Sequence, residues 1–215
     1  ASESALAASP AILETVVTPD QLNLTTITIQ NTTNFPLPIK GSVSAFLATE
    51  AIPDSAKTTF DASSWFTLDP ADLILQPKEV KEIKVTITPP RDAEPGGHYA
   101  TAYFRPMIPQ EAVSQSSAIS LARIGVLAFL IVPGDINEKI IASPLSVPVF
   151  QAFGPVNLTA HLENQGSVHL LPNTKIELTD FRGKSVDTLT HPNTAILPHT
   201  TKQFDFTWTK KIGFG

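Results

Sequence analysis

Two stretches of this sequence follow nearly the same pattern: LILQPKEVKEIKVTITPP, from Leu73 to Pro90, and AILPHTTKQFDFTWTKKIGFG, from Ala195 to Gly215. In the first stretch, apolar and polar residues alternate from Ile83 to Thr88. Such alternation places the apolar side chains on one face, as in a half-buried strand of an antiparallel sheet. When Pro77 is aligned with Pro198, every apolar position of this strand recurs. The sequence therefore predicts the same strand twice, once in each of two tandem domains.

The repeat extends upstream of this strand. The stretch TIQNTTNFPLPIKGSVSAF has a counterpart in AHLENQGSVHLLPNTKIELTDF, which matches Asn31 with Asn164 and Phe46 with Phe181. A repeat of this length predicts tandem domains, because solenoid repeats have shorter periods of roughly 20 to 50 residues.

The rest of the chain consists of short β-branched and apolar runs separated by Pro, Asn, Asp and Gly, with almost no helical periodicity. About seven or eight such runs precede Pro133, as expected of a β-sandwich. We predict an all-β protein of two tandem immunoglobulin-like β-sandwiches. The expected parts are a flexible segment 1–9, a first sandwich 10–133, a linker 134–138 and a second sandwich 139–215.

One strand breaks the regular alternation. In LNLTTITIQN, from Leu22 to Asn31, the apolar residues change phase at Thr25–Thr26. A shift of one residue turns the following side chains to the other face of a sheet, so we expect a bulge or twist there.

The second sandwich is shorter than the first. After its repeat strand, the first copy continues through PPRDAEPGG into HYATAYFRP and a final apolar strand, whereas the second copy stops at Gly215. By this alignment the second sandwich lacks about two strands, and an incomplete sheet leaves edge N–H and C=O groups unpaired. Two explanations stay open: the sequence belongs to a longer protein that supplies these strands, or a partner donates a strand.

The composition excludes several classes of protein. The chain of 215 residues is 42% hydrophobic and 16% charged, which is typical of a folded protein. A net charge of −5 and a pI near 5.5 offer no basic surface for nucleic acid. Because the chain has no cysteine, thiolate catalysis, disulfides and Cys-ligated zinc are excluded.

Two features bear on cellular location. The longest apolar run, from Ile124 to Val132, has about half the length that a membrane-spanning helix needs, so we predict no membrane span in this chain. Near the start, Ala5-Leu6-Ala7 precedes Ala8 in the small-residue pattern of a signal-peptidase site. This start is either a remnant of export processing or a plain flexible segment.

No residue set predicts catalysis. The sequence contains no P-loop, dinucleotide-binding, zinc-protease, serine-hydrolase or EF-hand motif. Asp69 and Asp72 could pair as general acid and base, but an Asp-Pro that begins a turn explains Asp69 more simply. The histidines are His98, His161, His169, His191 and His199. They lack the spacing of a metal site, and we interpret them as solvated loop residues. We expect no enzyme activity and no cofactor.

A ligand-binding surface is expected from aromatic residues. The candidates for a glycan-stacking platform are Trp65, Phe66, Tyr99, Tyr103, Phe104 and Trp208. Most are expected in the core, whereas the hydroxyl groups of Tyr99 and Tyr103 suit a wet surface. With the neighbouring Arg105, these two tyrosines are the predicted binding residues.

The predicted domain junction contains a run of oxygen-bearing side chains. In PGDINE, residues Asp135, Asn137 and Glu138 could bind calcium and stiffen the linker. The same run is also typical of an ordinary polar linker, so both interpretations stay open.

The motifs TITIQNTTNFP, LQPKEVKEIKVTITPP, PGGHYATAYF and the final VPG resemble those of bacterial surface Ig-like domains, and are similar to the peptidoglycan-binding domain of WxL-interacting proteins. HLENQGSV and ILPHTTKQF resemble the second Ig-like domain of that family. A weaker resemblance is to periplasmic pilus chaperones, through the alternating strand SLARIGVLAFLIVP. Arg123 is available as a basic cleft residue of that family, without an identified partner.

These resemblances imply a non-enzymatic, exported bacterial cell-surface protein that binds or scaffolds. It would be anchored by a membrane helix beyond Gly215 and would recognise cell-wall polymer or another surface protein. The alternative is a pilus chaperone or pilus-like subunit that donates or accepts a strand, with strand exchange at the open edge of the second sandwich. Each implies an extracytoplasmic location, at the bacterial cell surface or in the periplasm.

Overall fold

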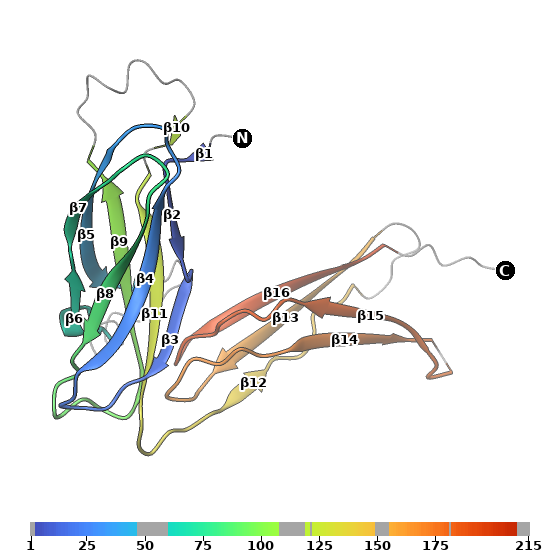
Figure 1. Cartoon of the computed structure of the whole chain (residues 1–215). Helices are drawn as coiled ribbons and strands as arrows, with labels where there is room; N and C mark the ends of the chain where they lie inside the picture. Colours follow the sequence, from blue (N-terminus) through green and yellow to red (C-terminus); the bar gives the residue numbers. More distant parts are fainter. Residues whose placement is uncertain are drawn as a thin grey trace. The chain divides into compact units, whose positions relative to one another are not determined.

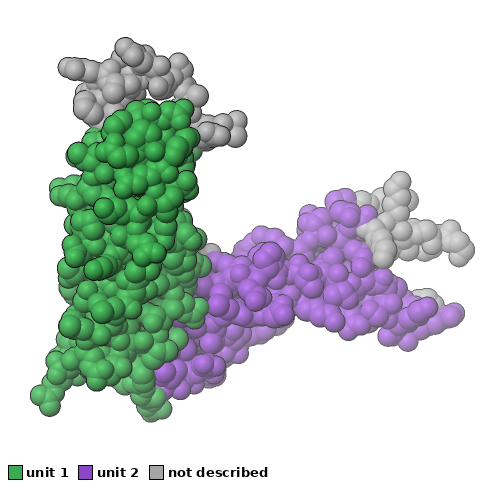
Figure 2. Space-filling view, viewed as in Figure 1, with its two compact units in different colours: residues 1–48, 53–135 green, residues 49–52, 136–215 purple. Residues whose placement is uncertain are grey.

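The computed structural model describes residues 3–46, 60–107, 119–120, 122–148, 155–180 and 182–209. The chain forms two compact units that divide between Asp135 and Ile136 (Figure 2). We call the described residues up to Asp135 unit 1 and those from Ile136 unit 2. The division falls inside the predicted linker 134–138.

Unit 1 is a sandwich of two sheets (Figure 1). The five-stranded sheet contains, in spatial order, β3 (Ile12–Val16), β11 (Ile124–Val132), β9 (Gly96–Pro106), β5 (Leu37–Ala45) and β7 (Asp72–Leu75). The four-stranded sheet contains β2 (Leu6–Ser9), β4 (Asn23–Asn31), β8 (Val80–Ile87) and β6 (Phe66–Asp69). A short parallel pair, β1 (Glu3–Ser4) with β10 (Ile119–Ser120), and a 3-10 turn, η1 (Ser63–Trp65), complete it. The prediction of an all-β protein with Ig-like sandwiches is confirmed.

The core of unit 1 lies between these sheets. In β8, the side chains of Ile83, Val85 and Ile87 are fully buried and those between them face outward, as the alternation predicts. Strands β9 and β11 supply a large share of the core: Ala100, Ala102, Phe104, Val126, Ala128, Leu130 and Val132.

Unit 2 repeats only part of this arrangement. Its described strands form one sheet of β12 (Ile140–Ala142), β13 (Val156–Asn164) and β16 (Thr201–Trp208), and a pair of β14 (Thr174–Thr179) and β15 (Ser185–His191). Its buried apolar cluster contains Leu158, Ile196, Phe204 and Phe206. Phe181, which the repeat matches with Phe46, and the end of the chain from 210 to 215 lie outside the described residues.

A buried asparagine closes the same corner in each unit. In unit 1, the amide group of Asn31 donates to the carbonyl oxygen of Phe35 at 2.8 Å. It also donates to the carbonyl oxygens of Leu75 at 3.1 Å and Gln76 at 3.0 Å. Its Oδ1 accepts from the backbone N–H of Thr33 at 2.9 Å. One side chain therefore ties the end of β4 to the turn between β7 and β8.

The corner of unit 2 is built in the same way. The amide group of Asn164 donates to the carbonyl oxygens of Val168 at 2.8 Å and Ile196 at 2.9 Å, and Oδ1 accepts from the N–H of Gly166 at 2.8 Å. Ile196 and Leu75 both lie two residues before the aligned prolines. The predicted match of the two asparagines is confirmed down to individual hydrogen bonds.

The turn after each aligned proline also recurs. Lys78 and His199 both have a left-handed backbone, with φ of 62° and 57°. The residue after each left-handed residue accepts a hydrogen bond from the buried asparagine of its unit. The backbone N–H of Asn31 donates to the carbonyl oxygen of Glu79 at 3.0 Å, and that of Asn164 donates to the carbonyl oxygen of Thr200 at 2.9 Å.

Two sequence-based expectations about unit 1 are wrong. Within the segment 1–9, predicted as flexible, residues 6–9 form β2 and pair with β4, because Leu6 supplies an apolar side chain that is 1% exposed. Of the bulge or twist expected at Thr25–Thr26, the bulge does not occur, since β4 pairs with β8 in unbroken register. The apparent change of phase arises because Leu24 points outward.

Candidate binding surfaces

Tyr99 lies in an aromatic cluster on the outer face of the five-stranded sheet. Its ring centroid is 5.3 Å from that of Phe129 and 6.3 Å from those of Phe46 and Phe60. Tyr99 alternates along β9 with the core residue Ala100, which turns it outward, but the neighbouring rings leave it only 3% exposed. It is not accessible to a ligand, which corrects the prediction of a surface role.

Tyr103 lies further along the same outer face and is only half-buried. Its ring packs over Gly125 of the neighbouring strand, where a Cβ atom would lie 3.1 Å from the ring carbon Cε1. The guanidinium carbon of Arg123 lies 4.1 Å from the ring centroid, in cation–π geometry. Phe104 is fully buried, so β9 does not present the predicted aromatic platform.

Basic side chains gather beside Tyr103. Arg105 follows it on the outer face of β9, and Lys40 is directly opposite Arg105 on β5. These residues and Ser42, Met107 and Arg123 line a cleft of about 670 Å³, which we call the basic cleft. Among the residues that the structure describes, no acidic side chain lines it. Of the predicted binding residues, the structure places Tyr103 and Arg105 here together and Tyr99 elsewhere; their role in binding stays a prediction.

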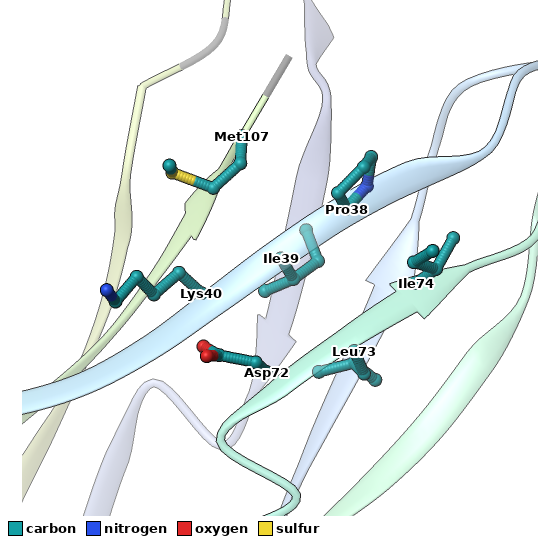
Figure 3. Close-up of a pocket in the computed structure, with 7 residues that line it drawn as sticks. All are labelled: Pro38, Ile39, Lys40, Asp72, Leu73, Ile74 and Met107. Atoms are coloured by element: carbon teal, nitrogen blue, oxygen red, sulfur yellow. The ribbon is translucent and has the colours of Figure 1, made fainter. Parts of the chain in front are cut away.

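A shallow pocket adjoins the basic cleft at the edge of the sheet (Figure 3). It has a volume of about 480 Å³ and shares Lys40 and Met107 with the basic cleft. Asp72 of β7 is directly opposite Lys40 of β5 (Figure 3). Ile74, another lining residue, is 61% exposed, so this edge also presents apolar surface.

The histidines do not share one environment. His98, predicted as a solvated loop residue, lies in β9 and is 4% exposed, because it occupies an inward position of that strand. Its ring packs on Trp65 and its Nε2 donates to the carbonyl oxygen of Glu94 at 2.8 Å, which leaves the buried Nδ1 without a partner. Burial lowers the pKa of His98 and outweighs the opposite effect of the Glu94 contacts. His169 is also buried, so the solvated-loop interpretation is wrong for it too.

The carboxylates of the two predicted clusters, the Asp69–Asp72 pair and the junction residues Asp135 and Glu138, are exposed to solvent. Asp69 and Asp72 are exposed at the two ends of a short turn, and Asp69 is directly opposite Lys84. Asp135 and Glu138 are exposed, and the described residues contain no group of three His, Cys, Asp or Glu that could hold a metal ion. The backbone of Asn137 is bonded to Ser167, and a cation site at this junction stays a prediction.

The second candidate surface is the edge of β14 in unit 2. In unit 1, β5 has the equivalent place and pairs with β7 on one side and β9 on the other. Among the described strands, β14 pairs with β15 alone. Several apolar side chains of unit 2 are only partly buried: Ile140, Val156, Ala160, Leu162, Ile176, Leu178 and Leu189. The place that β9 fills in unit 1 is therefore open in the described part of unit 2.

Comparisons with known proteins identify the fold. No protein-family model and no curated protein matches the sequence. One similar structure is a chain from the chaperone–tip adhesin complex of CFA/I fimbriae biogenesis, with 13% identity over 98% of this chain and 93% of that chain and a TM-score of 0.50. The fold of the present chain is therefore similar to that of fimbrial chaperones. The CupB2 chaperone of Pseudomonas aeruginosa has 12% identity over 93% of this chain and 88% of its own, also with a TM-score of 0.50.

At this level of identity the comparisons show the fold alone. Of the two resemblances drawn from the sequence, they support the one to pilus chaperones and give no support to the one to WxL-interacting proteins. Within the described residues, no helix combines the length and apolar character that crossing a membrane requires.

Proposed function

We propose that this chain is a non-enzymatic, extracytoplasmic binding protein that holds a polypeptide partner by strand pairing. The observation that carries this proposal is that β14 pairs with β15 alone among the described strands, beside the partly exposed apolar side chains of unit 2. An open edge offers N–H and C=O groups to an extended peptide, whose backbone bonds supply affinity while alternate side chains supply specificity.

Unit 1 indicates what kind of segment would fit. There, β9 pairs with the equivalent strand β5 and turns Ala100, Ala102 and Phe104 into the core. A partner strand on β14 would need the same alternation, with apolar side chains facing Ile176 and Leu178. A strand without this alternation would leave the apolar face of unit 2 in contact with water.

The fold supports a protein partner. One similar structure comes from a chaperone–tip adhesin complex that activates the biogenesis of CFA/I fimbriae. The narrower predictions, which are binding of cell-wall polymer and anchoring by a membrane helix, have no support from these comparisons.

The test uses a fluorescent peptide with the sequence of β9, Gly96–Pro106, added to the chain of 215 residues. We expect the anisotropy to rise on binding and the Ile176→Asp variant to lose this binding, because its carboxylate faces the apolar side of β14. The matched control is Lys175→Asp, one residue away on the exposed face, which should still bind. Circular dichroism shows whether each variant remains folded, and a milder Ile176→Thr variant should weaken binding if Ile176→Asp unfolds. No binding, or equal binding by all variants, would contradict the proposal.

A further inference from the structure

The basic cleft lies on unit 1, and the strand pairing proposed for β14 does not use it. Arg105 occupies the centre of a row of positive charges that crosses three strands. Lys40 is directly opposite it on β5, and Arg123 immediately precedes Ile124, whose partner is Phe104. Neighbouring strands are about 4.8 Å apart, so the three side chains start within a strip about 10 Å wide.

This arrangement costs stability in the absence of a ligand. Like charges directly opposite each other in a sheet repel. In the part of the chain that the structure describes, none of these three cations forms an ion pair. Lys40 lies between Arg105 on β9 and Asp72, which is directly opposite it on β7. A bound anion would offset the repulsion.

The basic cleft is positively charged, whereas the protein as a whole carries a negative net charge. The chain has a net charge of −5, yet the described residues that line the basic cleft include three cations and no carboxylate. A general attraction for anions is therefore not expected, and binding should depend on this row. The side chains of Lys40, Arg105 and Arg123 are all exposed to solvent.

The geometry favours phosphate over the other ligands of a cell surface. A neutral glycan would stack on an aromatic face, but Arg123 already covers a face of Tyr103. A carboxylate is planar and is satisfied by one guanidinium in a bidentate pair. A tetrahedral phosphate presents oxygens in several directions, so neighbouring phosphates can each be shared by adjacent cations in the row.

The size of the surface indicates a chain of phosphates. The basic cleft, of about 670 Å³, continues across Lys40 and Met107 into the pocket of about 480 Å³ in Figure 3. This space is larger than one phosphate needs. We propose that the basic cleft binds a polymer of phosphodiester-linked units, which crosses the strands of the outer face and contacts Lys40, Arg105 and Arg123.

The test is calorimetric titration of the whole chain with a synthetic glycerol-phosphate oligomer. We expect binding that weakens with salt, with a slope of about −2 in a plot of log K against log salt, since about three charges are neutralised. Arg105→Gln should weaken binding roughly fivefold. Asp72→Asn should strengthen it, because this change removes the carboxylate directly opposite Lys40.

Controls separate this site from weaker alternatives. Lys84→Gln removes one positive charge from an exposed position on the other sheet and should leave the affinity unchanged. A poly-glutamate peptide with the same number of charges and vesicles of phosphatidylglycerol are tested in parallel. The proposal is overturned if Lys84→Gln weakens binding as much as Arg105→Gln, or if the oligomer does not bind. It is also overturned if the peptide binds as tightly as the oligomer, or if the vesicles bind and the oligomer does not.

Discussion

Units 1 and 2 each contain a corner built in the same way, but they differ in how their sheets are completed. The two buried asparagines, the left-handed residue after each aligned proline and the strand that follows are the same in both units. In unit 1, β9 and β11 cover the core, whereas no described strand of unit 2 takes their place. The corner depends on short segments around one turn, while a covered core needs strands from distant parts of the chain. The corner can therefore be recognised from one short segment of sequence, whereas a covered core cannot.

Among the changes predicted here for the two units, replacing the buried asparagine should lower the free energy of unfolding the most. Asn31→Ala removes the buried amide that donates to the carbonyl oxygens of Phe35, Leu75 and Gln76 and accepts from the N–H of Thr33. We expect the free energy of unfolding of unit 1 to fall by about 3 kcal/mol. Asn164→Ala should have a comparable effect on unit 2.

Urea titration followed by tryptophan fluorescence can measure this for each unit, because Trp65 lies in unit 1 and Trp208 in unit 2. Replacing one tryptophan by phenylalanine makes the other the reporter. The control is Asn157→Ala at an exposed position of β13, which should change stability by less than about 0.5 kcal/mol. Equal effects of the control and the corner variants would show that the corners do not hold the units together.

Acid should weaken unit 1 through His98. Its pKa is lowered in the folded state by burial, so the unfolded state takes up the proton first as the pH falls below about 6.5. The stability contributed by neutral His98 is complete above that pH and is lost as the pH falls further. We expect the urea midpoint of unit 1 to fall between pH 7 and pH 5.

The His98→Gln variant tests the cause. A glutamine can still donate a hydrogen bond to Glu94 but does not titrate, so the pH dependence of unit 1 should become shallower. An unchanged dependence would assign it to other groups.

The left-handed turn residues provide the smallest test. His199→Gly should stabilise unit 2 by about 0.5 kcal/mol, because glycine adopts positive φ without steric strain. Lys78→Gly should stabilise unit 1 less, because it also removes the hydrogen bond from Nζ to the carbonyl oxygen of Thr32. Similar values in thermal denaturation would show that the two turns are energetically equivalent. Opposite signs would show that the matching backbone angles conceal different interactions.

The fold could be predicted from the sequence because strand alternation and turn residues are local signals. The alignment of Pro77 with Pro198 also located the matching asparagines. The basic cleft could be predicted only in part. The sequence indicates Tyr103 and Arg105 as binding residues, but Lys40, Arg105 and Arg123 lie far apart in the sequence and meet through the pairing of β5, β9 and β11. The burial of Tyr99 likewise depends on rings from other segments, which alternation along β9 cannot reveal.

Hydrogen exchange of β5 and β14 in the natural gene product tests most directly whether unit 2 presents an open edge. In unit 1, β5 is paired on both sides, so its amides should exchange slowly. We expect the amides of β14 on the side away from β15 to exchange much faster and to become protected when a partner strand binds. If β14 is as protected as β5 before any partner is added, the edge is already occupied and the proposed partner binding is contradicted.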